Sequence, residues 1–281
     1  MNMQHLQSAG GGIADDKRAR VIAVASGKGG VGKTNISANL AVCFASAGKK
    51  VVLVDADFSL GNLDVVMGVE SRYNVSHLIS GARTMADITS IGPCGVEILC
   101  GASGVESLAE LSDFHRQRLL GELERLGDEA DVMIIDNAAG IGSCVTGFCM
   151  AADHVLVVTT PEPAAVTDAY AMIKVLVMRQ FKGRISVIVN MAGSAEEGRR
   201  IYRQIARVAR QFLDAQVFEA GVLLKDEKLC SAVRKQTPVV LAYPRAGVAV
   251  ALAAMASRLS KSRVFDDAQR GFFRKVVNWF V

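Results

Sequence analysis

A glycine-rich stretch near the amino end of the sequence holds the residues best suited to chemistry. Residues 26–37 read SGKGGVGKTNIS, in which Gly27, four further residues, Gly32, Lys33 and Thr34 match a phosphate-binding loop. Glycines let backbone N–H groups approach phosphate oxygens closely, and the amino end of a following helix adds partial positive charge. We expect Lys33 to contact the β- and γ-phosphates and the Thr34 hydroxyl to bind Mg²⁺. The residues predicted to bind the nucleotide are Gly27, Gly29, Gly30, Val31, Gly32, Lys33, Thr34 and Asn35.

Three aspartates follow apolar runs at positions where they could serve this loop. Asp55 ends the run VVLVD and Asp136 ends the run VMIID. If both runs are parallel strands, their carboxyl ends face the phosphate loop along one edge of a sheet. We expect Asp136 to hold a water molecule on Mg²⁺, and Thr34, Asp55 and Asp136 to form the metal site. Asp57 lies two residues beyond Asp55, where it would either orient the attacking water or cap a turn.

The elements that must position these residues alternate between strand-like and helical patterns from Arg20 onward. Continuous apolar strands indicate burial on both faces, so we expect an α/β fold with a doubly wound, mostly parallel sheet and helices on both faces. Strand-like runs cover residues 21–25, 51–55, 96–100, 132–136, 154–160, 184–190 and 217–224. Helical patterns cover residues 34–47, 105–127, 143–152, 164–180, 195–213, 227–235 and 246–259.

The composition is that of a globular chain with a sizeable core. The 281 residues are 51% hydrophobic and 21% charged, and the formal net charge is +4. That weak basic bias permits an acidic partner without requiring one. The cysteines form no CxxC pair, which favours reduced thiols over a zinc or disulfide framework. Neither a signal peptide nor a membrane-spanning run is expected.

A lysine ahead of the usual one gives the loop a resemblance to a known family. KGGVGKT, with Lys28 preceding Lys33, resembles the deviant Walker A motif of the MinD/ParA ATPases, and the resemblance extends over residues 20–281. It implies that Lys28 crosses a two-fold interface and contacts the partner's nucleotide, so that ATP is sandwiched in a homodimer with Mg²⁺. A slow, partner-stimulated hydrolysis then returns the dimer to monomers. The catalytic residues implied are Lys28, Lys33 and Asp57.

The resemblance also implies three further site residues. Asn190, in VIVNMAG, would read adenine. Glu162 and Asp168, in PEPAAVTDAY, would line the dimer interface. Each of the three could instead be a helix N-cap or a turn residue.

Three stretches narrow the resemblance to one branch of that family. GPCGVEILCGASG, VTDAYAMIKVL and VNMAGSAEEGRRIYRQI resemble the FlhG/FleN (YlxH) branch, which controls flagellar number and placement, more than the division regulator MinD. The partners implied are an FlhF-like GTPase, a C-ring component or a flagellar transcription activator. The chain departs from the expected pattern at two places. Asn137 stands where a small hydroxyl residue is expected. GVLLKDE lacks the proline expected near the base of the bound nucleotide. No DQAxxLR activator motif precedes Arg20.

The last residues of the sequence predict an amphipathic helix. On a helical wheel of residues 270–281, apolar side chains fill one half and basic or polar ones the other. A broad apolar face with a tryptophan and a basic opposite face is typical of a helix lying in an anionic membrane surface. Two copies in an ATP dimer would bind far more tightly than one, which makes membrane attachment ATP-dependent. The residues predicted to contact the membrane are Phe272, Phe273, Val276, Val277, Trp279 and Phe280.

These patterns divide the chain into three parts. Residues 1–19 would be a flexible tail, residues 20–260 a P-loop ATPase domain, and residues 261–281 a linker and membrane-targeting helix. The expected location is the cytoplasm, with reversible attachment to the inner face of the cell membrane. The alternative for the last segment is an ordinary terminal helix docked on its own domain.

Other functions compete with the flagellar one. The same motifs would serve a MinD-like division-site regulator or a ParA-like DNA partition ATPase. Arginines in residues 196–211 keep DNA binding open, although a solvated helix face is the simpler interpretation and we do not expect nucleic acid as a partner. Cys100 and Cys144 would allow an iron–sulfur cluster shared by a dimer, but both lie in stretches that the flagellar branch explains better.

Overall fold

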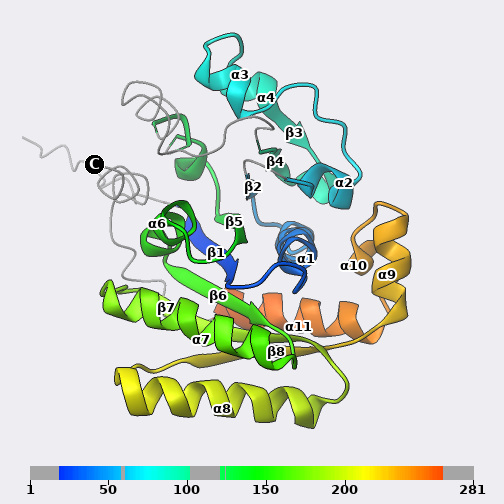
Figure 1. Ribbon diagram of the computed structural model, residues 1–281. Helices are drawn as coiled ribbons and strands as arrows, with labels where there is room; N and C mark the ends of the chain where they lie inside the picture. Colours follow the sequence, from blue (N-terminus) through cyan, green and yellow to red (C-terminus); the bar gives the residue numbers. More distant parts are fainter. Residues whose placement is uncertain (1–18, 58–60, 102–120, 124, 262–281) are drawn as a thin grey trace, which may run out of the picture.

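A central sheet organises the chain. The computed structural model describes residues 19–57, 61–101, 121–123 and 125–261 (Figure 1). Its sheet has eight strands in the order β3-β4-β2-β5-β1-β6-β7-β8. Neighbouring strands are parallel except β3 and β4, which pair antiparallel. The predicted mostly parallel α/β sheet is confirmed.

The element bounds are as follows. The strands are β1 Arg20–Ser26, β2 Val51–Ala56, β3 Thr89–Ile91, β4 Glu97–Leu99, β5 Val132–Ala139, β6 His154–Thr159, β7 Arg184–Ala192 and β8 Phe218–Leu224. The helices are α1 Lys33–Ser46, α2 Leu63–Met67, α3 Val75–Ile79, α4 Met85–Ile88, α6 Ser143–Ala151, α7 Pro163–Met178, α8 Ala195–Leu213, α9 Glu227–Arg234, α10 Val239–Ala242 and α11 Gly247–Lys261, with a short 3₁₀ turn at Pro93–Gly95.

Helices cover both faces of the sheet because the strands bury side chains on both sides. In β1, Val21 and Ala23 pack into the core that includes residues of α6, α7 and α8. Ile22 and Val24 point the other way, into the core that includes residues of α1 and α11. Successive strand residues face opposite sides of a sheet, so an uninterrupted apolar strand supplies two cores at once.

The order of the strands reverses at β1, and this places the phosphate loop. β1 lies between β5 and β6, and the chain passes from β1 through α1 to β2 on one side before later reaching β6 on the other. In open sheets of this kind, ligands bind beyond the carboxyl ends of the strands at such a switch point. The segments that follow β1, β2 and β5 therefore meet at one edge.

Most predicted elements are present with small shifts at their ends. The predicted strands correspond to β1, β2 and β4 through β8. The elements that the patterns did not predict, α2, α3, α4, α10 and β3, have five residues or fewer, too few to show a period. Most of the predicted helix over 105–127 lies outside the described residues, as do the tail up to residue 18 and the C-terminal segment from residue 262.

Two exclusions made from the sequence can be compared with the structure. In the described ranges, no helix is both long enough and apolar enough to cross a membrane. All six cysteines lie in those ranges and are free thiols: Cys43, Cys94, Cys100, Cys144, Cys149 and Cys230.

The packing of α8 on the sheet generates a test of the fold. Gly198 lies so close to Val222 of β8 that an added Cβ would overlap the valine side chain. We expect Gly198→Ala to lower the free energy of unfolding by about 1–3 kcal/mol, because α8 must shift away from the strand. Urea titration followed by circular dichroism measures the change.

Gly121→Ala is the matched control, because Gly121 is helical and exposed and an added Cβ there meets nothing within 4 Å. It should be neutral or slightly stabilising, since alanine favours helix more than glycine does. Equal stability of the two variants would contradict the close packing.

Candidate functional site

The phosphate loop lies against two neighbouring elements that leave no room for side chains. A Cβ on Gly27 would stand 2.5 Å from the carbonyl oxygen of Asp168 in α7. A Cβ on Gly32 would overlap the side-chain amide nitrogen of Asn190, and Gly32 also has a φ of 93°, a value that favours glycine. The loop passes so close to α7 at Gly27 and to β7 at Gly32 that only glycine fits at these two positions. Asp168 borders the loop with its carbonyl group and its Cβ.

Lys33 is held inside the loop. The residue is only 8% exposed, and its ammonium group donates a hydrogen bond of 2.9 Å to Ser26 Oγ. The same hydroxyl donates to the carbonyl oxygen of Lys28 at 2.7 Å, so Ser26 connects both ends of the loop. Burial lowers the pKa of Lys33, while the carboxylates of Asp136 and Asp57 act to raise it. A buried ammonium group at the start of a helix suits an anionic ligand.

Asp136 lies directly beneath the start of α1. Its Oδ1 accepts a hydrogen bond of 2.9 Å from Ser37 Oγ, and the Thr34 hydroxyl also bonds to this carboxylate. Burial nevertheless raises the pKa of Asp136 to about 6. The structure thus brings Thr34 and Asp136 together, as the predicted metal site requires.

Asp55 lies beside Asp136 on the adjacent strand. The two are register partners in the β2–β5 pair, and both are 2% exposed. Asp55 accepts hydrogen bonds from the backbone N–H groups of Asp57, at 3.0 Å, and Leu63, at 3.3 Å. Burial, followed by the negative charge of Asp136, raises the pKa of Asp55 to about 7. Two buried carboxyl groups side by side favour either protonation or a bound cation.

The oxygen atoms at this edge suit Mg²⁺, which proteins usually bind together with waters and substrate phosphates, better than a metal that the protein alone would coordinate. A hydroxyl from Thr34 and carboxylates from Asp55 and Asp136 are hard oxygen donors, which Mg²⁺ prefers. Within the described part of the chain, no group of three or more His, Cys, Asp and Glu residues is arranged to hold a metal ion. Mg²⁺ usually completes its shell with waters and substrate phosphates, so an incomplete protein set is expected.

Asp57 lies in a turn, but the carboxylate that caps this turn is that of Asp55. Its backbone N–H closes a turn onto Asp55 Oδ1. Its carboxylate is near enough to raise the pKa of Asp55 and Asp136 and to act on Lys33. The turn is a property of the backbone, so the carboxylate can still serve the site. Its role in orienting water stays a prediction.

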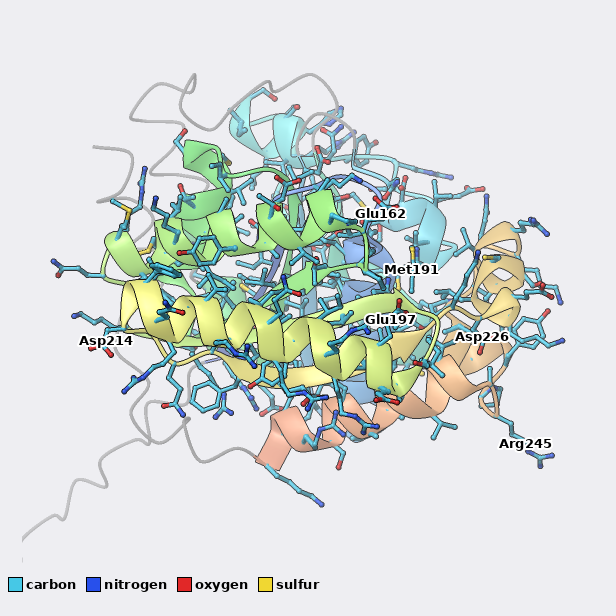
Figure 2. The ribbon with its side chains drawn as sticks, turned by 60° about the horizontal axis from the view of Figure 1, so that its bottom comes forward. Glu162, Met191, Glu197, Asp214, Asp226 and Arg245 are labelled. Carbon is cyan, nitrogen blue, oxygen red and sulfur yellow. The ribbon has the colours of Figure 1, made fainter. Side chains whose placement is uncertain are left out.

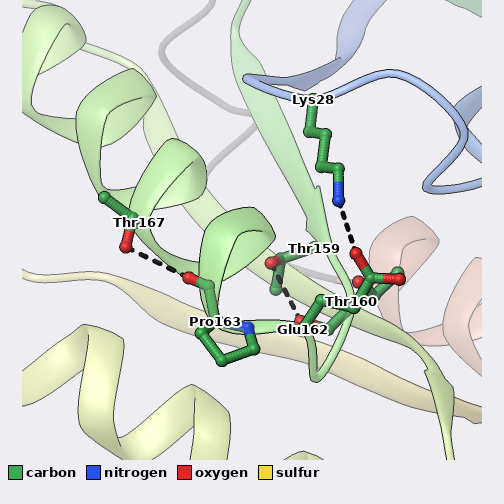
Figure 3. A network of polar contacts seen from close by, with 6 residues as sticks. All are labelled: Lys28, Thr159, Thr160, Glu162, Pro163 and Thr167. Atoms are coloured by element: carbon green, nitrogen blue, oxygen red, sulfur yellow. Dashed lines mark hydrogen bonds and ion pairs between the residues drawn. The ribbon is translucent and has the colours of Figure 1, made fainter.

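Lys28 occupies a different environment from Lys33. Its ammonium group forms an ion pair with Glu162 at the start of α7 (Figure 3). The side chains are 38% and 66% exposed, so this ion pair is accessible from solvent. Glu162 holds the N-cap position of α7 but makes no side-chain capping bond, which leaves its carboxylate for Lys28. The hydroxyl of Thr167 nearby bonds to a backbone carbonyl instead.

Asn190 has a structural role that the sequence did not reveal. It is buried near the end of β7, and its Nδ2 donates a hydrogen bond of 2.8 Å to the carbonyl oxygen of Val31. It is therefore neither an N-cap nor a turn residue, and it fixes the phosphate loop from the side. Its role in reading adenine stays a prediction.

Two serines that position the site were not predicted. Ser26 holds the Lys33 ammonium group, and Ser37 holds the Asp136 carboxylate. A signal for Ser37 was present, because it lies one helical turn beyond Lys33 and Thr34 and so shares their face. Asn137 stands where a small hydroxyl residue was expected. It follows Asp136 in the strand, so its side chain faces the opposite side of the sheet. Its Nδ2 donates a hydrogen bond of 3.1 Å to the carbonyl oxygen of Val24.

Comparison with known proteins defines the class of this chain. Residues 22–239 match the model of the CobQ/CobB/MinD/ParA nucleotide-binding domain. The chain therefore belongs to this family, and the resemblance stated from the loop motif is confirmed.

Two curated relatives lie in the flagellar branch. The chain is 41% identical over 240 residues to the antiactivator FleN of Pseudomonas aeruginosa, covering 85% of this chain and 86% of FleN. It is 36% identical over 209 residues to the flagellum site-determining protein YlxH of Helicobacter pylori, covering 74% of this chain and 70% of YlxH. The predicted similarity to the FlhG/FleN (YlxH) branch is confirmed.

Among solved structures, the septum site-determining protein MinD of Pyrococcus horikoshii, complexed with Mg-ADP, has the same fold. Its TM-score is 0.71 at 24% identity, covering 86% of this chain and 96% of that chain.

The buried carboxyl groups predict how stability depends on pH without metal or nucleotide. The pKa of Asp55 is raised from 3.8 to about 7, so the folded chain binds more protons than the unfolded one between these values. Stability is therefore lost as pH rises through this window. Burial lowers the pKa of His154 from 6.5 to about 3, which removes stability only as pH falls below about 6.5. Between pH 6.5 and 8 we expect the free energy of unfolding to decrease.

Asp55→Asn tests the cause of this decrease. The variant lacks the ionisation, so its free energy of unfolding should change less over the same pH range. Urea titrations at several pH values in the presence of a chelator measure both slopes. Parallel slopes for the two proteins would show that Asp55 is not the group responsible.

Proposed function

We propose that this chain is an ATP-dependent, dimerising and membrane-associating regulatory ATPase that controls flagellar number or placement. Its cofactors are ATP and Mg²⁺, and hydrolysis switches the dimer to monomers. The observation that carries the proposal is the contrast between the two lysines. Lys33 is buried within the loop. Lys28 lies beside it, and its ammonium group forms a solvent-accessible ion pair with Glu162.

The residues of the loop and the sheet edge divide the binding of the nucleotide. Backbone N–H groups of the loop and the Lys33 ammonium group bind the β- and γ-phosphates. Thr34 binds Mg²⁺, and Asp55 and Asp136 hold its shell. Asn190 has its amide nitrogen engaged with the loop, so its amide oxygen is the atom left to accept a bond from the amino group of adenine.

Hydrolysis requires a positioned water and stabilised negative charge. Asp57 follows β2 next to Asp55 and is electrostatically coupled to Lys33, which suits it to orient the water. Lys28 of a second subunit supplies an additional cation at the transferring phosphoryl group, in the manner of an arginine finger.

In the proposed dimer, the Lys28 ammonium group leaves Glu162 of its own subunit and contacts the nucleotide of the other subunit. In the single chain its ammonium group pairs with Glu162 at the start of α7. An exposed pair of this kind contributes little, about 0–1 kcal/mol, so exchange for a partner's nucleotide is inexpensive. Glu162 and Asp168 then lie at the interface, because both belong to the α7 region next to the loop.

Membrane attachment is assigned to the C-terminal segment, which lies outside the described residues. Its apolar and basic halves suit an anionic surface, and a dimer presents two copies. The chain would then be cytoplasmic and bind reversibly at the inner face of the cell membrane.

Flagellar proteins are the proposed partners. An FlhF-like GTPase, a C-ring component or a flagellar transcription activator would read the ATP-bound dimer. The relationship to FleN and YlxH supports a flagellar role over division-site selection. The fold alone does not separate the two, because the septum site-determining protein MinD has the same fold. DNA partition is supported by the family alone.

Lys28→Ala tests the dimer. We expect it to bind ATP as a monomer nearly as well as the unaltered chain but to lose the dimer, because the lysine acts across the interface. Light scattering after size-exclusion chromatography with Mg²⁺ and a non-hydrolysable ATP analogue measures the mass. Lys49→Ala, an exposed lysine after α1, is the control and should dimerise normally. A dimer that persists in Lys28→Ala would refute the role in trans.

Trp279 provides a built-in probe of the membrane step, since it is the only tryptophan of the chain. With vesicles containing anionic lipid and Mg²⁺, we expect a blue shift of its emission and co-sedimentation with ATP but not with ADP. Vesicles of neutral lipid alone are the control. Absence of binding with either nucleotide would remove the membrane from the proposal while leaving the ATPase intact.

A further inference from the structure

The last strand of the described sheet has one side without a partner strand. β8 pairs with β7 on one side and ends the strand order on the other. The β7–β8 register passes from Val187–Glu219 to Ile188–Gly221, so Ala220 is an extra residue that forms a bulge. A bulge at an edge redirects a backbone group and limits the stretch open to pairing. Beyond it, β8 continues to Leu224, with a second register shift between the Val189–Val222 and Ala192–Leu224 pairs.

A groove follows this edge between two helices. α8 packs on one face of the sheet and α11 on the other, and Figure 2 shows α8 across the front of the molecule with Asp214 at one end. The groove has a volume of about 360 Å³ and is lined by residues of α8, β8 and α11. Its helical walls include the short side chains of Ala195, Ala251 and Ala254 and the longer ones of Met255 and Arg258. Met255 and Arg258 lie over Gly221, and Ala220, Gly221 and Leu223 are buried, so the accessible residues of the edge beyond the bulge are Val222 and Leu224.

The charge of the groove is positive. Arg199 of α8 and Arg258 of α11 line it, together with Glu219 of β8. Arg258 donates a hydrogen bond of 2.8 Å from Nη2 to the carbonyl oxygen of Ala220, which places its guanidinium group at the bulge. Among the described residues, no carboxylate forms an ion pair with either arginine.

The basic character continues outside the groove along α8. Arg203, Arg207 and Arg210 are exposed and fall on the same side of the helix as Arg199 at about 100° per residue. Of these, Arg210 is paired with Asp214 at 3.3 Å. An acidic chain approaching β8 would therefore meet a positive surface before it reached the edge.

We propose that β8 accepts an additional strand from a partner protein, and that this strand is an extended segment carrying acidic side chains. Its backbone pairs with β8 beyond the bulge, at Val222 and Leu224, while its carboxylates reach Arg199 and Arg258. Strand addition draws affinity from main-chain hydrogen bonds and specificity from side chains on the two faces, and both are offered here. The flanking helices favour a single extended chain over the edge of a second sheet.

A synthetic peptide tests this pairing on the full-length protein. The probe is a fluorescein-labelled octapeptide of alternating valine and glutamate, and fluorescence anisotropy measures its binding. We expect binding that is lost when alternate backbone nitrogens of the peptide are methylated, because methylation removes the donors without changing the side chains. We also expect at least about tenfold weaker binding when lysine replaces glutamate.

Two pairs of variants locate the site. Arg199→Glu should weaken binding at least about tenfold, whereas Arg207→Glu, an equal charge change on α8 outside the groove, should have a smaller effect. Ala254→Trp should block the groove, whereas Ala253→Trp, which faces a different cavity from the next position of α11, should not. Circular dichroism and thermal unfolding verify that each variant is folded.

Several results would overturn the proposal. They are absence of peptide binding, equal binding of the methylated peptide, or equal weakening by Arg199→Glu and Arg207→Glu. A dimer without nucleotide that Ala254→Trp abolishes, with no peptide binding, would assign the edge to a second copy of the chain. The Lys28-dependent dimer is measured separately, so failure here leaves the proposed ATPase function untouched.

Discussion

The burial of charged groups at one edge of the sheet is the constraint on which the site depends. Lys33, Asp55 and Asp136 are nearly inaccessible to solvent, at 8%, 2% and 2% exposure. Buried charges are tolerated only when neighbouring groups bond to them. Here Ser26 holds the ammonium group, while Ser37 and backbone N–H groups hold the carboxylates. The loop, α1 and the ends of β2 and β5 are ordered by satisfying these groups.

The protein alone compensates these buried charges only in part. The pKa of Asp55 is raised to about 7 and that of Asp136 to about 6, so both carboxyl groups lie in surroundings unfavourable to their charged forms. The pKa of Lys33 is lowered for the corresponding reason. A divalent cation beside the carboxylates and an anion beside the lysine would reverse all three effects. The electrostatics thus favour a metal-bound polyphosphate without any new folding of the site.

The sequence could predict this edge because each residue follows a strong local pattern. Asp55 and Asp136 end continuous apolar runs, and Lys33 and Thr34 follow a glycine-rich turn, so strand direction alone brings them together. Contacts between distant segments carried no such pattern. The bond from Asn190 to Val31 joins residues 159 positions apart and depends on β7 lying two strands from β1. The pairing of Lys28 with Glu162 likewise depends on where α7 begins.

Short elements escaped prediction for a related reason. α2, α3 and α4 are fixed by caps and by packing onto the sheet rather than by their own periodicity. Asn74 and Thr84, for example, make capping boxes that stabilise helices of a single turn. Such elements contribute little to the site, so the prediction of the site did not require them.

The sheet also separates two kinds of contact. The nucleotide site and Lys28 lie at the carboxyl end of β1, whereas the open side of β8 lies beyond β6 and β7 in the strand order. At about 4.8 Å between neighbouring strands, the two strands are about 14 Å apart. A partner strand on β8 would then add to the sheet laterally, without occupying the surface around Lys28 and Glu162. Nucleotide binding at the end of β1 and strand addition at β8 would therefore use separate surfaces, and the strand order keeps them apart.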